Sequence, residues 1–479
     1  MKKRNAYIAI LAAMTMTAAS CGKSFLDEEP SLSVSVGSAI LTEGNMLEAM
    51  NGAYRAMTPT LLFGRNVPLF GDLLADNVYL SISNSNRLVP MNNYTFVGSS
   101  AEAAGIWANA YIAIQQANRV ISSQLTASNN VNQMAGEAHA LRAICYFYLV
   151  NYFAKPYAEN PEADGVPVVT LPSSETGALI KPARNKVSEV YAQIVSDLEK
   201  AYELMPATGM TIHPNNSNFF SKYAAKALQA RAYLYMGEWA KARDAAAIVE
   251  KDGGYSLAGT EAAFNTYWGG NVARTDKLET IFELNYNSTA NLGVEGLDAI
   301  YSRAAVGDML VTDELYNLYA ATDRRRGLIV PGQRGGLDVL YVNKYQNTGI
   351  ADRDEVKLLR YAEVLLILAE SHARLGNDTE GQKYLNMVAQ NRDASFAGYA
   401  LTGQALVDAT ITERRKELAF EGLRLFDLYR QNATFNRPNM GVKAHSSYVE
   451  VKTTDFRRLQ PIPEAELAAN PNMRKNLGY

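Results

Sequence analysis

Residues 219–255 read FFSKYAAKALQARAYLYMGEWAKARDAAAIVEKDGGY, and this stretch decides the fold. Apolar residues recur at helical spacing on both sides of Gly237, which predicts two helices separated by a tight turn. The first stripe comprises Tyr223, Ala227, Ala230, Leu234 and Met236, and the second comprises Trp239, Ala242, Ala246 and Val249. The small residues Ala230 and Ala242 allow the two helices to approach closely. Together with Tyr233, Gly237 and Trp239, they have the spacing of a tetratricopeptide helical hairpin.

The same pattern recurs elsewhere in the chain. Ala369, His372, Gly376, Asp378 and Gly381 have the same offsets within residues 361–391, which again predict two short helices. Upstream, Arg142-Ala-Ile-Cys-Tyr146 repeats the pattern of Gln229-Ala-Arg-Ala-Tyr233 in the first hairpin. A single hairpin cannot bury its own apolar face and must stack on neighbours. We therefore expect a mainly α protein built as a tetratricopeptide-type α-superhelix.

The composition excludes several functional classes. The chain has 479 residues, of which 48% are hydrophobic and 20% charged, as in a globular protein with a substantial core. Lys and Arg total 46 against 49 Asp and Glu, and after residue 4 no basic run exceeds three residues, which argues against nucleic-acid binding. Two cysteines and four scattered histidines make neither a disulfide framework nor a metal cluster. We expect no metal and no cofactor.

The first residues have the organisation of an export signal. Met1-Lys-Lys-Arg4 is a positive segment, and the apolar stretch from Ala6 to Met16 is too short to span a bilayer stably. Ala18-Ala-Ser20 then leads directly to Cys21, and this arrangement resembles a bacterial lipoprotein cleavage site. We expect residues 1–20 to be a lipoprotein signal peptide, Cys21 to carry the lipid, and residues 21–38 to form a tether. The alternative is an ordinary signal peptide with an incidental cysteine.

The remaining residues, 39–479, are interpreted as one body with two kinds of segment. Helical repeats are expected at about 39–57, 106–153, 187–252, 354–391 and 404–431, the last as one long helix from Gln404 to about Gln431. Between them, residues 58–105 and 253–350 are rich in Gly, Asn, Ser and aromatic residues. These two segments predict an irregular, loop-rich part with a few short strands.

No sequence motif predicts catalysis. Gly376–Lys383 half-matches a phosphate-binding loop, but its lysine is one place late and it occupies a hairpin turn. Glu417 and Glu421, four residues apart, suggest the two carboxylates of a hydrolase. Their neighbours Arg414, Arg424 and Arg430 favour a helix-surface or interhelical ion-pair ladder with these acids and Asp427. We therefore assign no catalytic residue.

The aromatic residues of the loop-rich part are the better functional signal. A large ring left in water forgoes about 1.5–3 kcal/mol of burial, so rings in polar loops suggest a partner that covers them. Sugars present apolar C–H faces, which suit flat rings accompanied by Asn, Asp and Arg. Trp268, within Tyr267-Trp-Gly-Gly-Asn271, is predicted to be an exposed platform for such a ligand. The other candidate ligand-binding residues are Tyr267, Tyr79, Arg87, Tyr94, Tyr286 and Tyr301. The alternative is that most of these rings seal a core between loops and repeats.

Several segments resemble one family in the same order along the chain. Residues 411–430, ITERRKELAFEGLRLFDLYR, closely resemble a signature helix of the SusD/RagB family. Residues 361–370 resemble its penultimate repeat, and residues 141–150 its early apolar helix. Further similar landmarks are Phe25-Leu-Asp27, Asp323-Arg-Arg325, Lys344-Tyr345, Pro461-Ile-Pro463 and Asn476-Leu-Gly-Tyr479. The resemblance runs from residue 21 to residue 479.

This resemblance implies a nutrient-binding lipoprotein on the extracellular face of an outer membrane. Such proteins work with a SusC-like TonB-dependent barrel and deliver an oligosaccharide to it. Some relatives bind peptides, so a peptide ligand is an alternative. A helical-repeat scaffold without a small ligand is a further alternative. The family has no catalytic residues to carry over, and its ligand-site residues vary between members.

Overall fold

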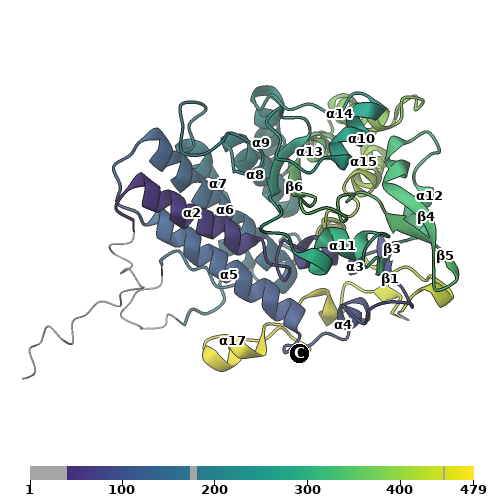
Figure 1. Ribbon diagram of the computed structural model, residues 1–479, viewed down its shortest axis with the longest axis horizontal. Coiled ribbons are helices and arrows are strands. Elements are labelled where there is room, and N and C mark those ends of the chain that lie inside the picture. The colour runs from purple at the N-terminus through teal and green to yellow at the C-terminus, as the bar shows by residue number, and fades with distance from the viewer. Residues whose placement is uncertain (1–39, 173–180, 446–447) are drawn as a thin grey trace, which may run out of the picture.

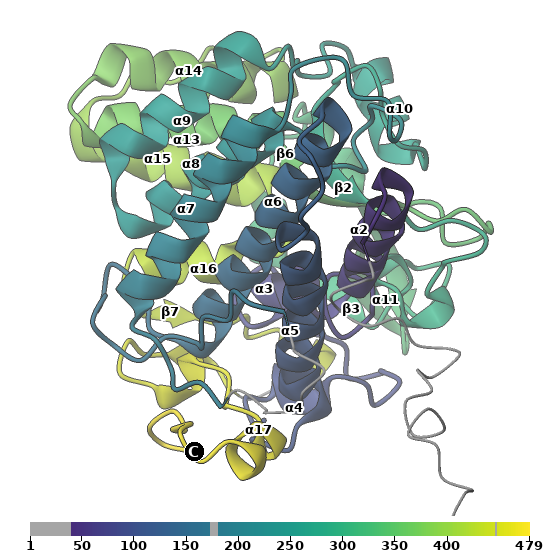
Figure 2. The ribbon, with the colours of Figure 1, turned by 90° about the vertical axis from the view of Figure 1, so that its left-hand side faces the viewer.

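A computed structural model describes residues 40–172, 181–445 and 448–479 (Figure 1). The predicted signal peptide, the lipidation residue Cys21 and the tether lie outside these residues. A succession of helices forms the larger part of the molecule, and each packs against the next. The helices are α2 (Glu43–Met57), α5 (Ala101–Ile121), α6 (Asn129–Phe153), α7 (Val187–Leu204), α8 (Lys222–Met236), α9 (Trp239–Asp252), α13 (Tyr361–Arg374), α14 (Asp378–Arg392) and α15 (Gly403–Glu417). Figure 2 shows α7, α8, α9, α13 and α14 stacked along one side. The predicted mainly α, tetratricopeptide-type superhelix is confirmed.

The two predicted hairpins close in the same way. Gly237 between α8 and α9 has φ +77°, and Gly376 between α13 and α14 has φ +76°. In each turn the residue after the glycine donates its backbone N–H to a carbonyl in the last turn of the helix: Glu238 to Tyr233 at 2.9 Å, and Asn377 to His372 at 2.8 Å. Only glycine adopts this left-handed conformation without strain. The recurring glycine therefore marks a real structural repeat.

The other side of the molecule holds short elements and long loops. An antiparallel sheet has the strand order β1 (Val78–Leu80), β3 (Met309–Val311), β5 (Leu337–Val342), β4 (Ile329–Arg334). A second strand pair joins β2 (Thr280–Leu284) to β6 (Val356–Arg360), and a third joins β7 (Phe435–Asn436) to β8 (Glu450–Val451). The short helices are α3 (Asn66–Leu73), α4 (Val89–Asn92), α10 (Glu261–Gly269), α11 (Leu297–Tyr301), α12 (Asp313–Asn317), α16 (Arg424–Arg430) and α17 (Glu464–Ala469). The expected short strands are present, but residues 58–105 and 253–350 also contain the helices α3, α4, α10 and α11, which the loop interpretation missed.

The predicted long helix from Gln404 to Gln431 is wrong. Helix α15 ends at Glu417 and α16 begins at Arg424, because Phe420 and Gly422 have φ angles of +70° and +81°. A Cβ on Gly422 would lie 2.4 Å from the Cα of Pro68, so only glycine fits against α3 here. The carboxylate of Asp72 accepts the backbone N–H groups of Phe420 at 3.2 Å and Gly422 at 2.8 Å. A contact with a distant helix therefore breaks the helical pattern.

A buried ion network joins the repeats to the loop-rich side. Glu417 contacts Arg360 and Arg392 at 2.9 Å and Arg325 at 3.1 Å, and Glu421 contacts Arg360 at 2.7 Å. These guanidinium groups hold the pKa of Glu417 well below its usual value despite the opposing effect of burial. The predicted ion-pair ladder is confirmed only at Asp427, which pairs with Arg414 and Arg430 at 2.8 Å and so joins α15 to α16. Glu417 and Glu421 pair instead with the distant arginines named above, and the helix-surface form of the prediction is wrong because all these side chains are buried. The partners of Glu417 come from residues far away in sequence.

Across the portion that the structure describes, none of the helices combines the length and apolar character that a membrane span requires.

Candidate functional site

Trp268 is buried, and the predicted exposed platform is therefore wrong. It is a residue of α10 and exposes 3% of its surface. Its ring lies 4.4 Å from the ammonium of Lys344 and 5.1 Å from the guanidinium of Arg360, and it contacts the Tyr267 ring edge-on. A Trp face attracts cations strongly when both are desolvated. Trp268 therefore covers one face of the buried ion network.

The other predicted rings are buried too. The side chains concerned are Tyr79, Tyr94, Tyr267, Tyr286 and Tyr301, and none exposes more than 4% of its surface. The hydroxyl of Tyr286 donates to the carbonyl of Thr58 at 3.0 Å, and the Tyr301 ring stacks on Tyr345. Their exposure was predicted wrongly because residues from distant parts of the chain, such as Thr58 and Tyr345, contact them in the fold. The alternative, that rings seal the core between loops and repeats, describes these positions.

Arg87 is the predicted site residue that keeps contact with solvent. A third of its side chain is exposed, and its guanidinium contacts the carboxylate of Glu295 at 2.9 Å. The other oxygen of that carboxylate contacts Arg65 at 2.8 Å. A ligand role for Arg87 stays a prediction.

Three loops meet on the loop-rich side and form what we call the loop rim, residues 271–273, 285–296 and 348–353. The amide of Asn271 donates to the carbonyl of Asp352 at 3.1 Å, and the carboxylate of Asp352 accepts the N–H of Ser288 at 2.8 Å. Arg353 donates to the carbonyl of Gly293 at 2.8 Å. The loop rim exposes Asn291, Ser288 and Thr289 together with the apolar side chains Val272, Val294 and Ile350.

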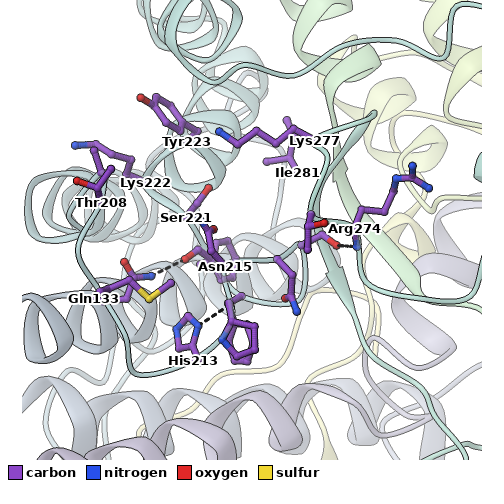
Figure 3. Close-up of a pocket in the computed structure, with 18 of the residues that line it drawn as sticks. Gln133, Thr208, His213, Asn215, Ser221, Lys222, Tyr223, Arg274, Lys277 and Ile281 are labelled. Atoms are coloured by element: carbon purple, nitrogen blue, oxygen red, sulfur yellow. Dashed lines mark hydrogen bonds between the residues drawn. The ribbon is translucent and has the colours of Figure 1, made fainter.

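Half-exposed aromatic rings gather at a different place, a cavity of about 290 Å³ that we call the junction pocket (Figure 3). It lies where the link between α7 and α8 meets the segment that leads into β2. Its aromatic lining residues include Phe219, Tyr223 and Tyr255, all of them partly exposed. Across the residues that the structure describes, Phe456 in the C-terminal tail is the most exposed aromatic residue, at 40%. At the junction pocket, three partly exposed rings therefore border one cavity.

A hydrogen-bonded network forms the floor of the junction pocket. His213 Nε2 lies 2.6 Å from an oxygen of Glu137, which is fully buried on α6. Gln133 donates to the same oxygen at 2.6 Å, and Tyr54 donates to the other oxygen at 2.8 Å. Burial lowers the pKa of His213, but the hydrogen bond and the charge of Glu137 outweigh it, so this pKa is raised. The imidazole also stacks on the ring of Phe219 in the same link, and its contact with Glu137 holds the link to α6.

The entrance of the junction pocket carries lysines and tyrosines. The Lys277 ammonium lies 5.7 Å from the Tyr223 ring and 5.5 Å from the Tyr255 ring, and it donates to the carbonyl of Gly253 at 2.8 Å. Lys222 begins α8 on the opposite wall, with its ammonium 4.6 Å from the Tyr202 ring. Figure 3 shows Tyr223 and Lys277 at one end, His213 and Gln133 at the other, and Ser221 and Asn215 between them.

The sequence interpretation missed the junction pocket because residues 187–252 were assigned wholly to helical repeats. The signal that could have found it is the run of non-helical residues from Pro206 to Ser217, which contains Gly209, His213 and several Asn residues. A long polar link between two repeat helices predicts a loop that carries function. The aromatic residues of the segments 58–105 and 253–350 led to the prediction of a site in those segments instead.

Buried carboxyl groups lie beneath the loop rim. Burial first, and then the negative charge of Glu283, raise the pKa of Glu355 to about 9. Burial raises the pKa of Asp298 to about 6, although Arg353 lies 2.9 Å from this carboxylate. Among the residues that the structure describes, His, Cys, Asp and Glu side chains form no group that could hold a metal ion. Neither carboxyl group lines the junction pocket.

Two family profiles match the chain. One, described as "Starch-binding associating with outer membrane", matches residues 24–234, and the other, described as "SusD family", matches residues 329–479. A SusD-like protein of Formosa agariphila is 27% identical, with 96% of this chain and 97% of that protein aligned.

Solved structures show the same fold. A SusD superfamily protein of Bacteroides vulgatus has a TM-score of 0.82 at 26% identity, with 92% of this chain and all of that chain covered. A Bacteroides vulgatus protein provisionally named a sugar-binding protein has a TM-score of 0.83 at 28% identity, with the same coverage. A SusD superfamily protein of Bacteroides thetaiotaomicron has a TM-score of 0.78 at 27% identity, covering 91% of this chain and all of that one.

Proposed function

Because the chain belongs to the SusD/RagB family, we propose that it is a lipid-anchored outer-membrane protein that captures an oligosaccharide at the cell surface. It delivers this ligand to a SusC-like TonB-dependent transporter. Cys21 carries the lipid, and the body faces the medium.

The junction pocket carries the proposal of a sugar ligand. Its half-exposed Tyr223 and Tyr255 offer ring faces to apolar C–H groups, and Asn215 and Asn216 offer amides to hydroxyl groups. Such a mixture of flat rings and a few polar groups suits a sugar, which is apolar on its faces and polar at its rim. A matching family profile is described as starch-binding, and a protein of similar structure is provisionally named a sugar-binding protein, in agreement with this chemistry.

The junction pocket and the loop rim together form one extended binding surface. The backbone of Arg274 is held to Ser217 by hydrogen bonds at 2.9 Å and 2.7 Å, at the side of the pocket. Asn271, three residues earlier, belongs to the loop rim and is held to Asp352. Three residues span at most about 11 Å, so the two regions adjoin. A chain of several sugar units bound in the pocket continues along Asn291 and the neighbouring polar side chains of the rim.

Affinity electrophoresis tests the capture step. The soluble chain that begins after Cys21 is run through gels containing single plant, algal and host-type polysaccharides. We expect retardation by one polysaccharide class, and Tyr223→Ala abolishes most of it because the ring contacts the sugar. Tyr233→Ala is the matched control, since it lies on the same helix about 15 Å further along. Equal retardation of the two variants contradicts a role for the pocket.

A second experiment tests anchoring and delivery. In cells, Cys21→Ser should remove incorporation of labelled fatty acid and release the chain from the outer membrane, because stable anchoring needs the acyl chains. Cross-linking of the unaltered chain in outer membranes should recover a TonB-dependent barrel. Retention of the Cys21→Ser chain in the membrane, or cross-links to other proteins only, contradicts this part of the proposal.

A further inference from the structure

The lining of the junction pocket is cationic although the chain as a whole is slightly acidic. The lining residues include Lys222, Arg274, Lys277 and His213, and no Asp or Glu is among them. Over the whole chain, acidic residues outnumber basic ones, 49 to 46. A concave surface lined by one sign of charge concentrates ligands of the opposite sign. The pocket therefore differs in charge from the protein that contains it.

Two of these cations are not neutralised by a carboxylate. Within the described residues, neither Lys222 nor Lys277 contacts an acidic side chain at ion-pair distance. Lys277 donates one hydrogen bond, to Gly253, and an ammonium has three donors. Its position between Tyr223 and Tyr255 places the remaining donors beside the two rings.

The other two basic side chains of the lining are already compensated. Arg274 donates to Asp276 at 2.9 Å, and Figure 3 shows its side chain pointing away from Lys277 and Tyr223. His213 is paired with the carboxylate of Glu137 at 2.6 Å. The free positive charge of the junction pocket therefore belongs to Lys222 and Lys277.

We infer that the junction pocket selects a sugar that carries a negative charge, as a carboxylate or a sulfate. The inference rests on the proposed function, because Tyr223 and Tyr255 supply the ring faces that distinguish a sugar from a small inorganic anion. The ammonium of Lys277 pairs with the anionic group while the adjacent rings cover the apolar face of the same unit. Lys222 provides a second cation on the opposite wall for a neighbouring charged unit. A neutral sugar leaves both cations without a partner.

Calorimetry with matched ligands of higher and lower negative charge tests the inference. The probes are trigalacturonate with its methyl ester, and chondroitin sulfate tetrasaccharide with its desulfated form. For at least one pair, the soluble chain should bind the more highly charged form about tenfold more tightly at about 50 mM NaCl. Raising the NaCl concentration to about 300 mM should reduce this preference, because salt screens exposed charges. Lys277→Gln should reduce the preference to about twofold, and Lys222→Gln should reduce it in part. Thermal melting of each variant establishes that it is folded.

The control is Lys241→Gln, a lysine that also lies over a tyrosine ring, that of Tyr233 at 5.7 Å, but outside the pocket. It should leave the preference unchanged. Equal binding of the more and the less charged form in both pairs, or a preference that survives Lys277→Gln, overturns the inference and leaves sugar capture intact. Failure of every charged probe to bind, while neutral glycans bind, overturns it equally. Binding of no glycan at all counts against the proposed function itself.

Discussion

Replacing Trp268 with alanine should destabilise the fold, although the sequence first suggested an exposed ligand platform. The ring is 3% exposed and covers Lys344 and Arg360 at 4.4 Å and 5.1 Å. Truncating a buried Trp to Ala costs about 3–5 kcal/mol, and desolvated cation–π contacts contribute about 2 kcal/mol of that loss. The cavity would also open a path for water to the ion network. Trp268→Phe keeps a ring face toward Lys344, so we expect it to lose less than half as much.

The size of the chain sets the thermal shift expected for this variant. Unfolding entropy is about 2.1 cal/mol/K per residue, or about 0.9 kcal/mol/K for the roughly 430 described residues. A loss of about 4 kcal/mol therefore lowers the Tm by about 4 °C. Differential scanning calorimetry of Trp268→Ala, Trp268→Phe and the exposed-ring control Phe456→Ala measures it. An unchanged Tm for Trp268→Ala would refute the packing described here and restore the ring as a candidate platform.

Three further variants probe the buried charges. Glu417→Gln should cost about 3–5 kcal/mol, because it leaves Arg360 and its neighbours with less negative charge in a buried site, and urea unfolding measures it. Glu355→Gln should stabilise the protein by roughly 3 kcal/mol at pH 7 and by little at about pH 5, because the folded state keeps its proton up to a pKa of about 9 whereas the unfolded state loses it near 4.5. Equal melting shifts at the two pH values would contradict the raised pKa. His213→Gln should cost more stability at about pH 6 than at about pH 8.5. The pair of His213 with Glu137 is fully charged below the unfolded pKa of His213, about 6.5, and its contribution to stability is lost as pH rises through the raised pKa of the folded state. A loss of stability that is the same at both pH values would show that the His213 imidazole stays neutral in the folded protein.

The repeats were predictable because their signal is local. Gly237 and Gly376 each follow a helix whose apolar spacing is visible in one contiguous stretch of sequence. The turn at each glycine needs no distant partner. The break at Gly422 was not predictable from local pattern, because it depends on the backbone of Pro68 and the carboxylate of Asp72. Tertiary contacts with distant residues therefore override the local preference for a helix at this position.

The predicted site failed for a related reason. Trp268 precedes Gly269, Gly270 and Asn271, and such neighbours indicate an exposed loop. The residues that cover it, Lys344 and Arg360, come from elements far along the chain. The junction pocket likewise combines Gln133, the link before α8 and the segment before β2, which only the folded repeats bring together. Family membership was predictable from contiguous segments, whereas the pocket depends on tertiary structure.

The most direct test of the central claim is calorimetric titration of the soluble chain, beginning after Cys21, with purified oligosaccharides and with a peptide mixture. Capture of an oligosaccharide predicts saturable binding of one glycan class, weakened at least about tenfold by Tyr223→Ala and unchanged by Tyr233→Ala. Binding to peptides alone, or to no glycan, would contradict the account.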